Sequence, residues 1–339
     1  MEGDPVQIEI EVELGPGPLP PPSTVLSQRV GKLGTRTTVL RGAGDSLVAR
    51  YVVHGVPRGR YALEEAAAVV EDPFGVARAD VGLPAGSTLL VYPRLVELGP
   101  LFSDWGAGQA HGRRLLLRRP SGFDLHGVRE HIQGESLRRV HWPSTAKRGQ
   151  LIVKELEDAP RDEIAILLDA AVGSTGTPPD SSFDLQVRAA GSLLLAHSRR
   201  GRRSLLVVNG TAVETVRLTG AEDDLGRALA VLAAAEADGR TPASALLSLD
   251  RSTLAGSLEL TVVTAAVSSQ LVDALVRRVL SHRRASLVYV DPASFAGGNG
   301  REPGLLRLQA AGVPVAVLRR GDDLAAVLGR PKGVLAAHG

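Results

Sequence analysis

Histidines, acidic residues and a serine gather between positions 126 and 144 and are the first candidates for chemistry: His126, Glu130, His131, Glu135, His141 and Ser144. Histidine changes its charge near neutral pH, which makes it a common general base. The histidine spacing does not match the His-Glu-x-x-His pair of zinc hydrolases. Ser144 does not lie in the Gly-x-Ser-x-Gly turn that exposes a catalytic serine. We therefore expect no enzyme, and a hydrolase that uses this cluster is the second alternative.

The same region is strongly basic. Residues 111–154 carry ten Lys and Arg against three Asp and Glu, a net charge of +7, whereas the whole chain carries +2. Basic patches attract nucleic acid, acidic lipid headgroups or acidic protein surfaces. Single-stranded nucleic acid normally stacks on exposed aromatic side chains, and only Phe123 and Trp142 are available here. We expect an acidic protein partner or headgroups rather than nucleic acid, with a solvated basic face as the alternative.

Composition is that of an ordinary globular protein. The chain has 339 residues, 44% of them hydrophobic and 22% charged, and at about 150 residues per domain this predicts two domains. It has no cysteine, which excludes disulfides, cysteine zinc sites and thiol catalysis. The N-terminus is acidic and Pro-rich, unlike a signal peptide, and no stretch is apolar enough to span a bilayer. We expect a soluble, cytoplasmic chain.

Residues 1–100 are predicted to form a β-rich N-terminal domain. Residues 7–14 alternate apolar and acidic side chains, which is the period of a half-buried strand. Further strands are predicted at residues 46–53, 60–70 and 87–92, separated by Gly, Pro and Asp. Several short strands without a convincing helix predict a small β-sandwich.

Residues 101–160 are predicted to be a linker with the basic segment, and residues 161–339 an α/β domain. Strands are predicted at 164–168, 204–208, 211–218, 258–264, 286–290 and 313–318, and helices at 184–199, 221–237, 271–282 and 304–311. Asn209-Gly210 is the signal for a two-residue hairpin turn. Strands that alternate with helices predict a mostly parallel, Rossmann-like sheet covered on both faces, with ligands at the carboxyl ends of its strands.

Two groups of motifs resemble one bacterial family, catalogued as domain of unknown function 58. The segment that begins at Gly127 resembles its pattern Arg-Glu-Tyr, Gly-Asp, Arg-x-Ile-x-Trp, Ala-Arg-x-Gly-x-Leu-x-Val-Lys-Glu, with His131, Glu135 and Lys147 in place of the Tyr, the Asp and the Arg that follows Ala. Upstream, Arg58-Gly59-Arg60-Tyr61, Asp72-Pro73-Phe74-Gly75 and Val91-Tyr92-Pro93-Arg94 resemble its RGxY, DPFG and VYP elements. We assign the matching polar and signature positions to partner binding: Arg129, Glu130, Gly134, Glu135, Arg138, Arg139, Trp142, Lys147 and Lys154. The alternative is structural, since Arg138, Arg139 and Trp142 could hold a loop by pairing or stacking.

The resemblance implies an architecture and a partner. Members of this family have an N-terminal membrane hairpin, a β region, the signature and a von Willebrand factor A-like domain. The hairpin is absent here, so an anchor that precedes the chain would place it at the inner face of the plasma membrane. Members are usually encoded beside MoxR-type AAA+ ATPases, which implies joint work in the assembly or maturation of other proteins.

The metal site that such a domain implies has lost its ligands. It needs Asp-x-Ser-x-Ser after the first strand, a Thr, and a later Asp as hard oxygen ligands for Mg²⁺. Asp169 is present, but Ala171 and Gly173 replace both hydroxyls, and Ala265 stands where the later Asp belongs. We therefore expect a degenerate site around Asp169, with no metal and no cofactor. An offset loop could still bring in Ser174 or Thr175, and the alternative role of Asp169 is a loop cap or a salt-bridge partner.

These observations leave three hypotheses. The first is a non-catalytic protein-interaction module, an adaptor that docks a partner such as a MoxR-type ATPase. The alternative is a Mg-dependent adhesion-type domain, which requires Asp169 to bind the cation. The second alternative is the hydrolase with the histidine cluster. Gly297-Gly298-Asn299-Gly300 is not a phosphate loop because it lacks the Lys-Ser/Thr pair, and we interpret it as a flexible loop near the ligand edge.

Overall fold

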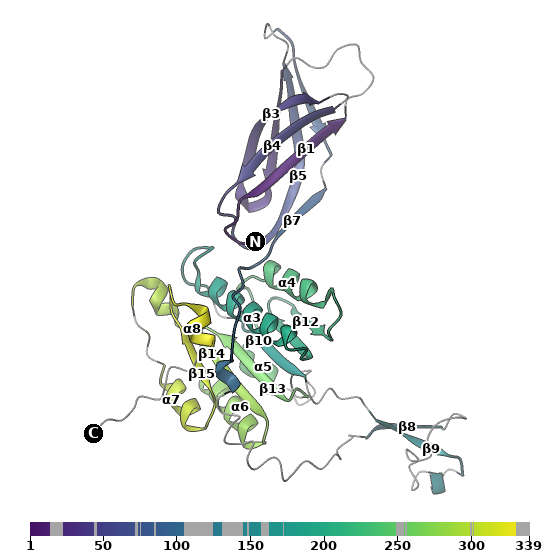
Figure 1. Ribbon diagram of the computed structural model, residues 1–339, viewed down its shortest axis with the longest axis vertical. Helices are drawn as coiled ribbons and strands as arrows, with labels where there is room; N and C mark the ends of the chain where they lie inside the picture. The colour runs from purple at the N-terminus through teal and green to yellow at the C-terminus, as the bar shows by residue number, and fades with distance from the viewer. Residues whose placement is uncertain are drawn as a thin grey trace.

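The computed structural model describes residues 1–13, 23–43, 46–71, 74, 76–84, 86–104, 125–130, 145–147, 149–156, 163–171, 173–248, 254, 256–298, 300 and 302–329. They form an antiparallel β unit, an α/β unit below it in Figure 1, and a separate two-stranded hairpin. No helix in these ranges is long and apolar enough to cross a membrane.

The β unit is one antiparallel sheet. Its strands are β1 (Val6–Glu13), β2 (Ser23–Val30), β3 (Thr35–Ala43), β4 (Ser46–Val53), β5 (Gly59–Glu71), β6 (Arg78–Leu83) and β7 (Ser87–Val91), with the short 3-10 helix η1 (Gly31–Leu33) after β2. The order is β1-β4-β3-β2-β5-β6, and β7 also pairs with β5. The strands predicted at 7–14, 46–53, 60–70 and 87–92 are confirmed to within a residue or two at each end.

This sheet curls back on itself. Ile8 of β1 and Tyr61 of β5 belong to one apolar cluster, although β4, β3 and β2 lie between these strands in the hydrogen-bonded order. A second cluster joins Leu26, Leu40 and Leu47. Alternate residues such as Glu9 are exposed, as the period of two requires. The predicted antiparallel β region is therefore present, with its core enclosed by its own strands.

The α/β unit has a sheet in the order β12-β11-β10-β13-β14-β15. All neighbours are parallel except the edge strand β12. The strands are β10 (Ile164–Leu168), β11 (Ser204–Asn209), β12 (Val213–Leu218), β13 (Glu259–Thr264), β14 (Arg284–Val290) and β15 (Val315–Leu318). The predicted α/β class with a mostly parallel sheet is confirmed.

Helices cover both faces of this sheet. They are α3 (Ser182–Arg199), α4 (Asp224–Ala234), α5 (Ala243–Ser248), α6 (Ser269–Leu280), α7 (Pro303–Ala310) and α8 (Leu324–Gly329), with the 3-10 helix η4 (Pro292–Ala296) after β14. Ile166 and Leu168 of β10 pack with α3, α4 and α8, and Ala165 and Leu167 pack with α5, α6 and α7. Successive strand residues point to opposite faces of the sheet. Because every residue of β10 is apolar, the strand contributes side chains to the apolar core on each face.

The chain leaves β7 and runs along α3 before residue 104. Gly191 permits this path, because a Cβ at this position would lie 2.6 Å from Cδ2 of Leu95. The 3-10 helix η2 (Phe102–Asp104) follows, and Leu101 and Phe102 are buried in the α/β core. Residues 101–104, which the sequence grouped with the linker, are therefore packed, because two adjacent apolar side chains fill a space beside α8 and β15.

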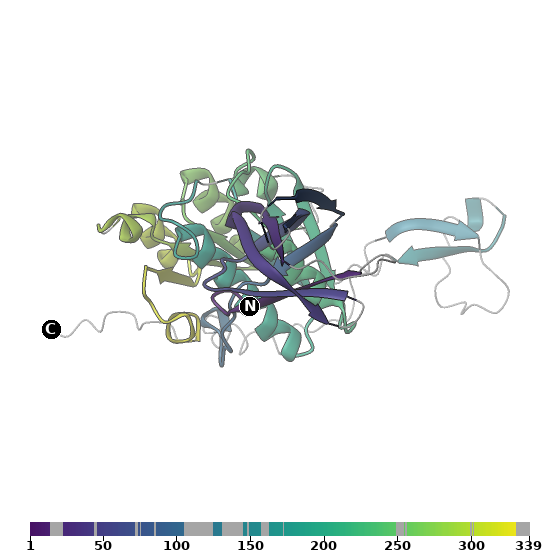
Figure 2. The same ribbon diagram turned by 90° about the horizontal axis from the view of Figure 1, so that it is seen from above.

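The hairpin consists of β8 (Leu125–Glu130) and β9 (Ile152–Leu156), which pair antiparallel (Figure 2). Neither strand was predicted from the sequence. The basic residues that dominate this region obscure the alternation of apolar side chains.

Candidate functional site

Asp169 lies at the point where the chain order reverses within the parallel sheet. It follows β10, and β10 has β11 on one side and β13 on the other. Ligands of open α/β sheets bind at the carboxyl ends of the strands around such a point. Asp169 is therefore placed where a ligand-binding side chain would be expected.

The carboxylate of Asp169 is occupied by donors from the protein itself. Nδ2 of Asn209 donates to Oδ1 over 2.8 Å, and Oγ1 of Thr264 donates to Oδ2 over 2.8 Å. The backbone N–H of Ala171 also donates to Oδ1, over 3.2 Å. Asp169 is only 3% exposed. These contacts agree with the alternative role of Asp169 as a loop cap.

The surrounding positions do not complete a cation site. Ala265 is buried beside Thr264, and Oγ of Ser182 accepts a hydrogen bond from the backbone N–H of Thr175 over 2.9 Å. Ser174 lines the crevice described below. Within the described ranges, no group of three or more His, Asp and Glu side chains could hold a metal ion.

Asn209 also corrects the predicted turn. Asn209 pairs with Val213, so the β11–β12 loop spans Gly210 to Ala212 rather than the two residues Asn209-Gly210. The side chain of Asn209 is fully buried and additionally donates to the carbonyl oxygen of Thr241 over 2.8 Å. A buried amide must be paired. The side chain of Asn209 therefore hydrogen-bonds Asp169 and Thr241 at the sheet edge and does not form part of the turn.

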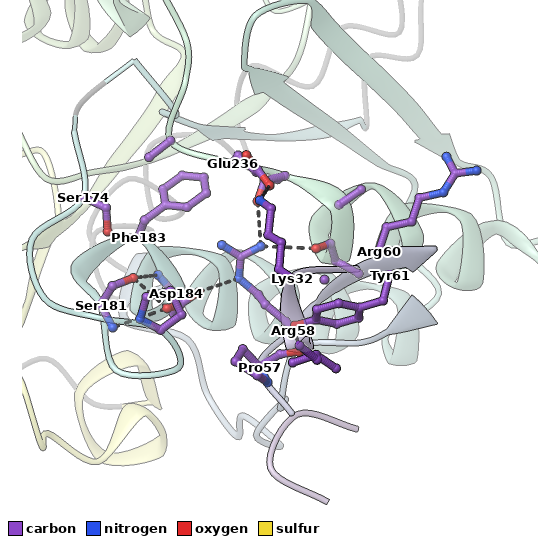
Figure 3. Close-up of a pocket in the computed structure, with 17 residues that line it drawn as sticks. Lys32, Pro57, Arg58, Arg60, Tyr61, Ser174, Ser181, Phe183, Asp184 and Glu236 are labelled. Atoms are coloured by element: carbon purple, nitrogen blue, oxygen red, sulfur yellow. Dashed lines mark hydrogen bonds and ion pairs between the residues drawn. The ribbon is translucent and has the colours of Figure 1, made fainter. Parts of the chain in front are cut away.

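A crevice of about 420 Å³ lies between the two units (Figure 3). The β unit contributes Lys32, Arg58 and Tyr61. The α/β unit contributes Ser174 and Phe183, with residues 233–237 at the end of α4. Tyr61, Phe183 and several alanines line it, together with charged side chains such as Arg58 and Glu236. The crevice is thus amphiphilic and draws on both units.

Arg58 joins three elements at this crevice. Its Nε lies 2.8 Å from Oδ1 of Asp184, and both side chains are more than nine-tenths buried. Its guanidinium lies 5.1 Å from the centroid of the Phe183 ring. Nη1 donates to three carbonyl oxygens at the end of α4, those of Leu232, Ala233 and Ala235, over 3.1, 3.3 and 2.7 Å. The last carbonyls of a helix lack partners within the helix, so one side chain satisfies them while it binds α3.

Burial dominates the electrostatics of Arg58. It lowers the pKa of the guanidinium below its usual value, and the carboxylates of Asp184 and Glu2 oppose this effect. A buried cation persists only when it is paired and hydrogen-bonded. Arg58 therefore depends on Asp184.

Asp184 has a second role at the start of α3. Ser181 Oγ accepts from the backbone N–H of Asp184 over 3.1 Å, and the Asp184 carboxylate accepts from the backbone N–H of Ser181 over 3.3 Å. This reciprocal pair is a capping box. The Ser-x-x-Asp spacing before an apolar helix is visible in the sequence, whereas its pairing with Arg58 is not.

A second buried ion pair connects the N-terminus to α3. Nε and Nη2 of Arg188 each lie 2.9 Å from one carboxylate oxygen of Glu2, which is 2% exposed. Oε2 of Glu2 also accepts from the backbone N–H of Arg94 over 3.3 Å. The hydrogen bond to Glu2 raises the pKa of Arg188. The exposed pair of Lys32 and Glu236 at the mouth of the crevice contributes little, because solvent screens it.

The predicted signature residues are only partly described. Arg129 and Glu130 lie on β8, Lys154 lies on β9 opposite Val128, and Lys147 is exposed in a short helical turn. The others lie outside the described residues: Gly134, Glu135, Arg138, Arg139 and Trp142. So do His131, His141 and Ser144 of the histidine cluster, while His126 is on β8. Arg58 belonged to the RGxY element but was not predicted as a site residue, because its role depends on contacts distant in sequence.

The structure is that of an α/β protein with an antiparallel β-rich N-terminal region. Residues 127–290 match the model of the family described as "Protein of unknown function DUF58", which supports the family assignment made from the sequence motifs. No curated protein matches the chain. A solved structure, the pilus adhesin RrgA from Streptococcus pneumoniae, aligns over 84% of this chain and 41% of its own, with 10% identity and a TM-score of 0.18. The chain thus spans less than half of that adhesin, and a likeness this distant carries no argument about fold or function.

Proposed function

We propose that the chain is a non-catalytic protein-interaction module that receives a segment of a partner protein in the crevice between its units. The α/β unit is proposed to be von Willebrand factor A-like, and the β unit a small β-sandwich. The strand order with one antiparallel edge strand and the cover of helices on both faces support the first assignment. The curled antiparallel sheet supports the second.

The crevice carries this proposal. Its volume of about 420 Å³ falls within the roughly 300–1,000 Å³ of typical ligand sites, which are mostly apolar with a few placed polar groups. Ala234 and other alanines at the end of α4 offer apolar surface above the buried rings of Phe183 and Tyr61, and Ser174 and Glu236 offer hydrogen-bonding groups. The buried pairs of Arg58 with Asp184 and Glu2 with Arg188 hold both walls in place. A preformed crevice costs little ordering on binding, which suits an extended peptide.

The partner is proposed from the family. A MoxR-type AAA+ ATPase is the leading candidate, and the pair would act in the assembly or maturation of other proteins. The basic segment of residues 111–154 would add attraction for an acidic surface of that partner.

The test is a pull-down with a purified MoxR-type ATPase, with and without ATP. Ala234, the exposed last residue of α4, lines the crevice, so Ala234→Trp fills it without removing a buried contact. We expect the wild type to retain the ATPase and Ala234→Trp to lose at least about tenfold in affinity. The matched control is Ala310→Trp, at the exposed last residue of α7. Recovery of nothing by the wild type in either nucleotide state, or equal loss in both variants, would overturn the proposal.

A further inference from the structure

The amino edge of the parallel sheet gathers positive charge at the end of the α/β unit away from the crevice. The turn at residues 200–203 leads into β11, and the turn at 281–283 leads into β14. Two strands, β10 and β13, lie between β11 and β14. At about 4.8 Å per strand, the two turns are roughly 14 Å apart on one edge.

Three arginines on these turns are exposed: Arg202, Arg203 and Arg283. Among the residues that the structure describes, none of their side chains forms an ion pair or hydrogen bond. Leu280, the last residue of α6, stands beside the second turn and is 73% exposed. We call these four residues the arginine edge.

The acidic residues that the structure describes at this edge each lie near an arginine. Glu163 and Glu259 are buried at the starts of β10 and β13, and their oxygens lie 3.0 Å from Arg217 and 3.8 Å from Arg284. Asp104 lies 3.2 Å from Arg200. The charge that faces solvent is therefore positive.

The titration of neighbouring groups reflects this field. Burial lowers the pKa of His197 to about 4, and the charges of Arg202 and Arg200 add to the effect. Burial likewise lowers the pKa of Arg278 to about 10, and Arg283 adds to it. Both groups respond to the arginines of the two turns.

The chain between Asp104 and Glu163 carries a net positive charge. The chain leaves the α/β unit after Asp104 and returns at Glu163, and both residues lie at this edge. The intervening residues 105–162 contain eleven Lys and Arg and seven Asp and Glu, a net charge of +4.

We propose that the arginine edge binds the headgroups of an anionic lipid surface. Arginines on separate turns of one sheet edge fit a plane of negative charges, and such surfaces attract clustered Lys and Arg. Leu280 is exposed three residues before Arg283, and apolar side chains flanked by cations enter the boundary between headgroups and acyl chains. This binding does not depend on occupation of the crevice.

The experiment is cosedimentation of the full chain with phosphatidylcholine vesicles, with and without about a third phosphatidylserine. We expect binding only to the anionic vesicles, and a steep loss above about 0.5 M salt because screening shortens the reach of the charges. The triple variant Arg202→Glu, Arg203→Glu, Arg283→Glu is expected to bind at least about 100-fold more weakly. Leu280→Ser is expected to bind about tenfold more weakly at unchanged charge.

The matched control reverses three exposed arginines elsewhere, Arg36→Glu, Arg41→Glu and Arg320→Glu, so that net charge changes equally. Circular dichroism and melting curves verify that both triple variants fold. Equal loss in both triple variants, binding to neutral vesicles, or an unaffected Leu280→Ser would overturn the proposal. The proposal would also be overturned if the wild type did not bind vesicles but was retained by immobilised poly-glutamate. That result would assign the edge to an acidic protein.

Discussion

Asp169 lies at the carboxyl end of β10, and its buried carboxylate is held by donors of the protein itself. Its two oxygens accept hydrogen bonds from Asn209, Thr264 and Ala171. A cation would have to displace these donors, and no group of three or more His, Asp and Glu side chains that could hold a metal ion lies within the described residues. The cost of leaving a buried amide and hydroxyl unpaired would then oppose metal binding.

Calorimetric titration of Mg²⁺ and Mn²⁺ tests this interpretation. We expect no saturable heat and no shift of the melting temperature. Asp169→Ala should lower the free energy of unfolding by about 1–3 kcal/mol, because Asn209 and Thr264 lose their acceptor. Saturable heat that disappears in Asp169→Ala would instead favour the Mg-dependent alternative.

His197 makes stability depend on pH. Its ring is fully buried, and neither ring nitrogen has a hydrogen-bond partner among the residues that the structure describes. Burial first, and then Arg202 and Arg200, lower its pKa from 6.5 to about 4. The unfolded chain therefore binds the proton more readily than the folded chain, so stability falls as the pH drops from 6.5 to 4.

The free energy of unfolding, measured by urea titration at several pH values, checks this prediction. The wild type should lose free energy of unfolding between pH 6.5 and 4, and His197→Leu should reduce that loss by up to roughly 3 kcal/mol. His54→Gln, at an exposed histidine, is the control and should keep the wild-type slope. An unchanged slope in His197→Leu would show that the ring is accessible to protons in the folded state.

At the scale of elements, the crossing of residues 92–101 over α3 depends on a missing side chain. Alanine in a helix is normally more favourable than glycine by about 1 kcal/mol. At Gly191, however, a Cβ would meet Cδ2 of Leu95 at 2.6 Å. We expect overpacking in Gly191→Ala to lower the free energy of unfolding by about 1–3 kcal/mol. The melting temperature should fall accordingly.

A double variant separates this cause from any other. Leu95→Ala removes the opposing atoms. The double variant Gly191→Ala, Leu95→Ala should therefore lose less stability than the sum of the losses in the two single variants. Additive losses in thermal melts would mean that the two residues do not interact.

Most elements could be predicted because their pattern is local. β4 and β10 were predicted with their observed bounds, since apolar period and flanking Gly, Pro or Asp mark them. β3 was missed because its residues TRTTVLRGA are mostly polar and exposed. α5 and α8 have six residues each, too few for a helical period to show.

The candidate site could be predicted only in part, for a different reason. Asp169 follows a recognisable strand, so its place at the sheet edge could be inferred from its neighbours in sequence. Its donors come from β11 and β13, 40 and 95 residues away. Arg58 is 126 residues from Asp184, and no period or motif links two such positions.

At the scale of the whole molecule, two buried ion pairs link the β unit and the N-terminus to α3. Removing one partner of a buried pair leaves an unpaired charge, which typically costs about 3–5 kcal/mol. We expect calorimetry of the wild type to show one unfolding transition. The double variant Arg58→Met, Glu2→Gln should show two, with the earlier one at least several degrees below the wild type.

The control for this prediction is Arg60→Met, which removes an exposed arginine from the same strand. It should keep the single transition at nearly the wild-type temperature. A double variant that also unfolds in one transition at that temperature would show that apolar contacts alone couple the two units.

The length of the parallel strands has a mechanical consequence. The crevice lies at their carboxyl ends and the arginine edge at their amino ends, so the sheet acts as a spacer of fixed height. A strand of five residues such as β10 spans about 17 Å. A peptide bound in the crevice would therefore lie roughly that far from any surface bound by the arginines. The hydrogen-bonded backbone of the sheet, rather than a flexible linker, would fix this distance.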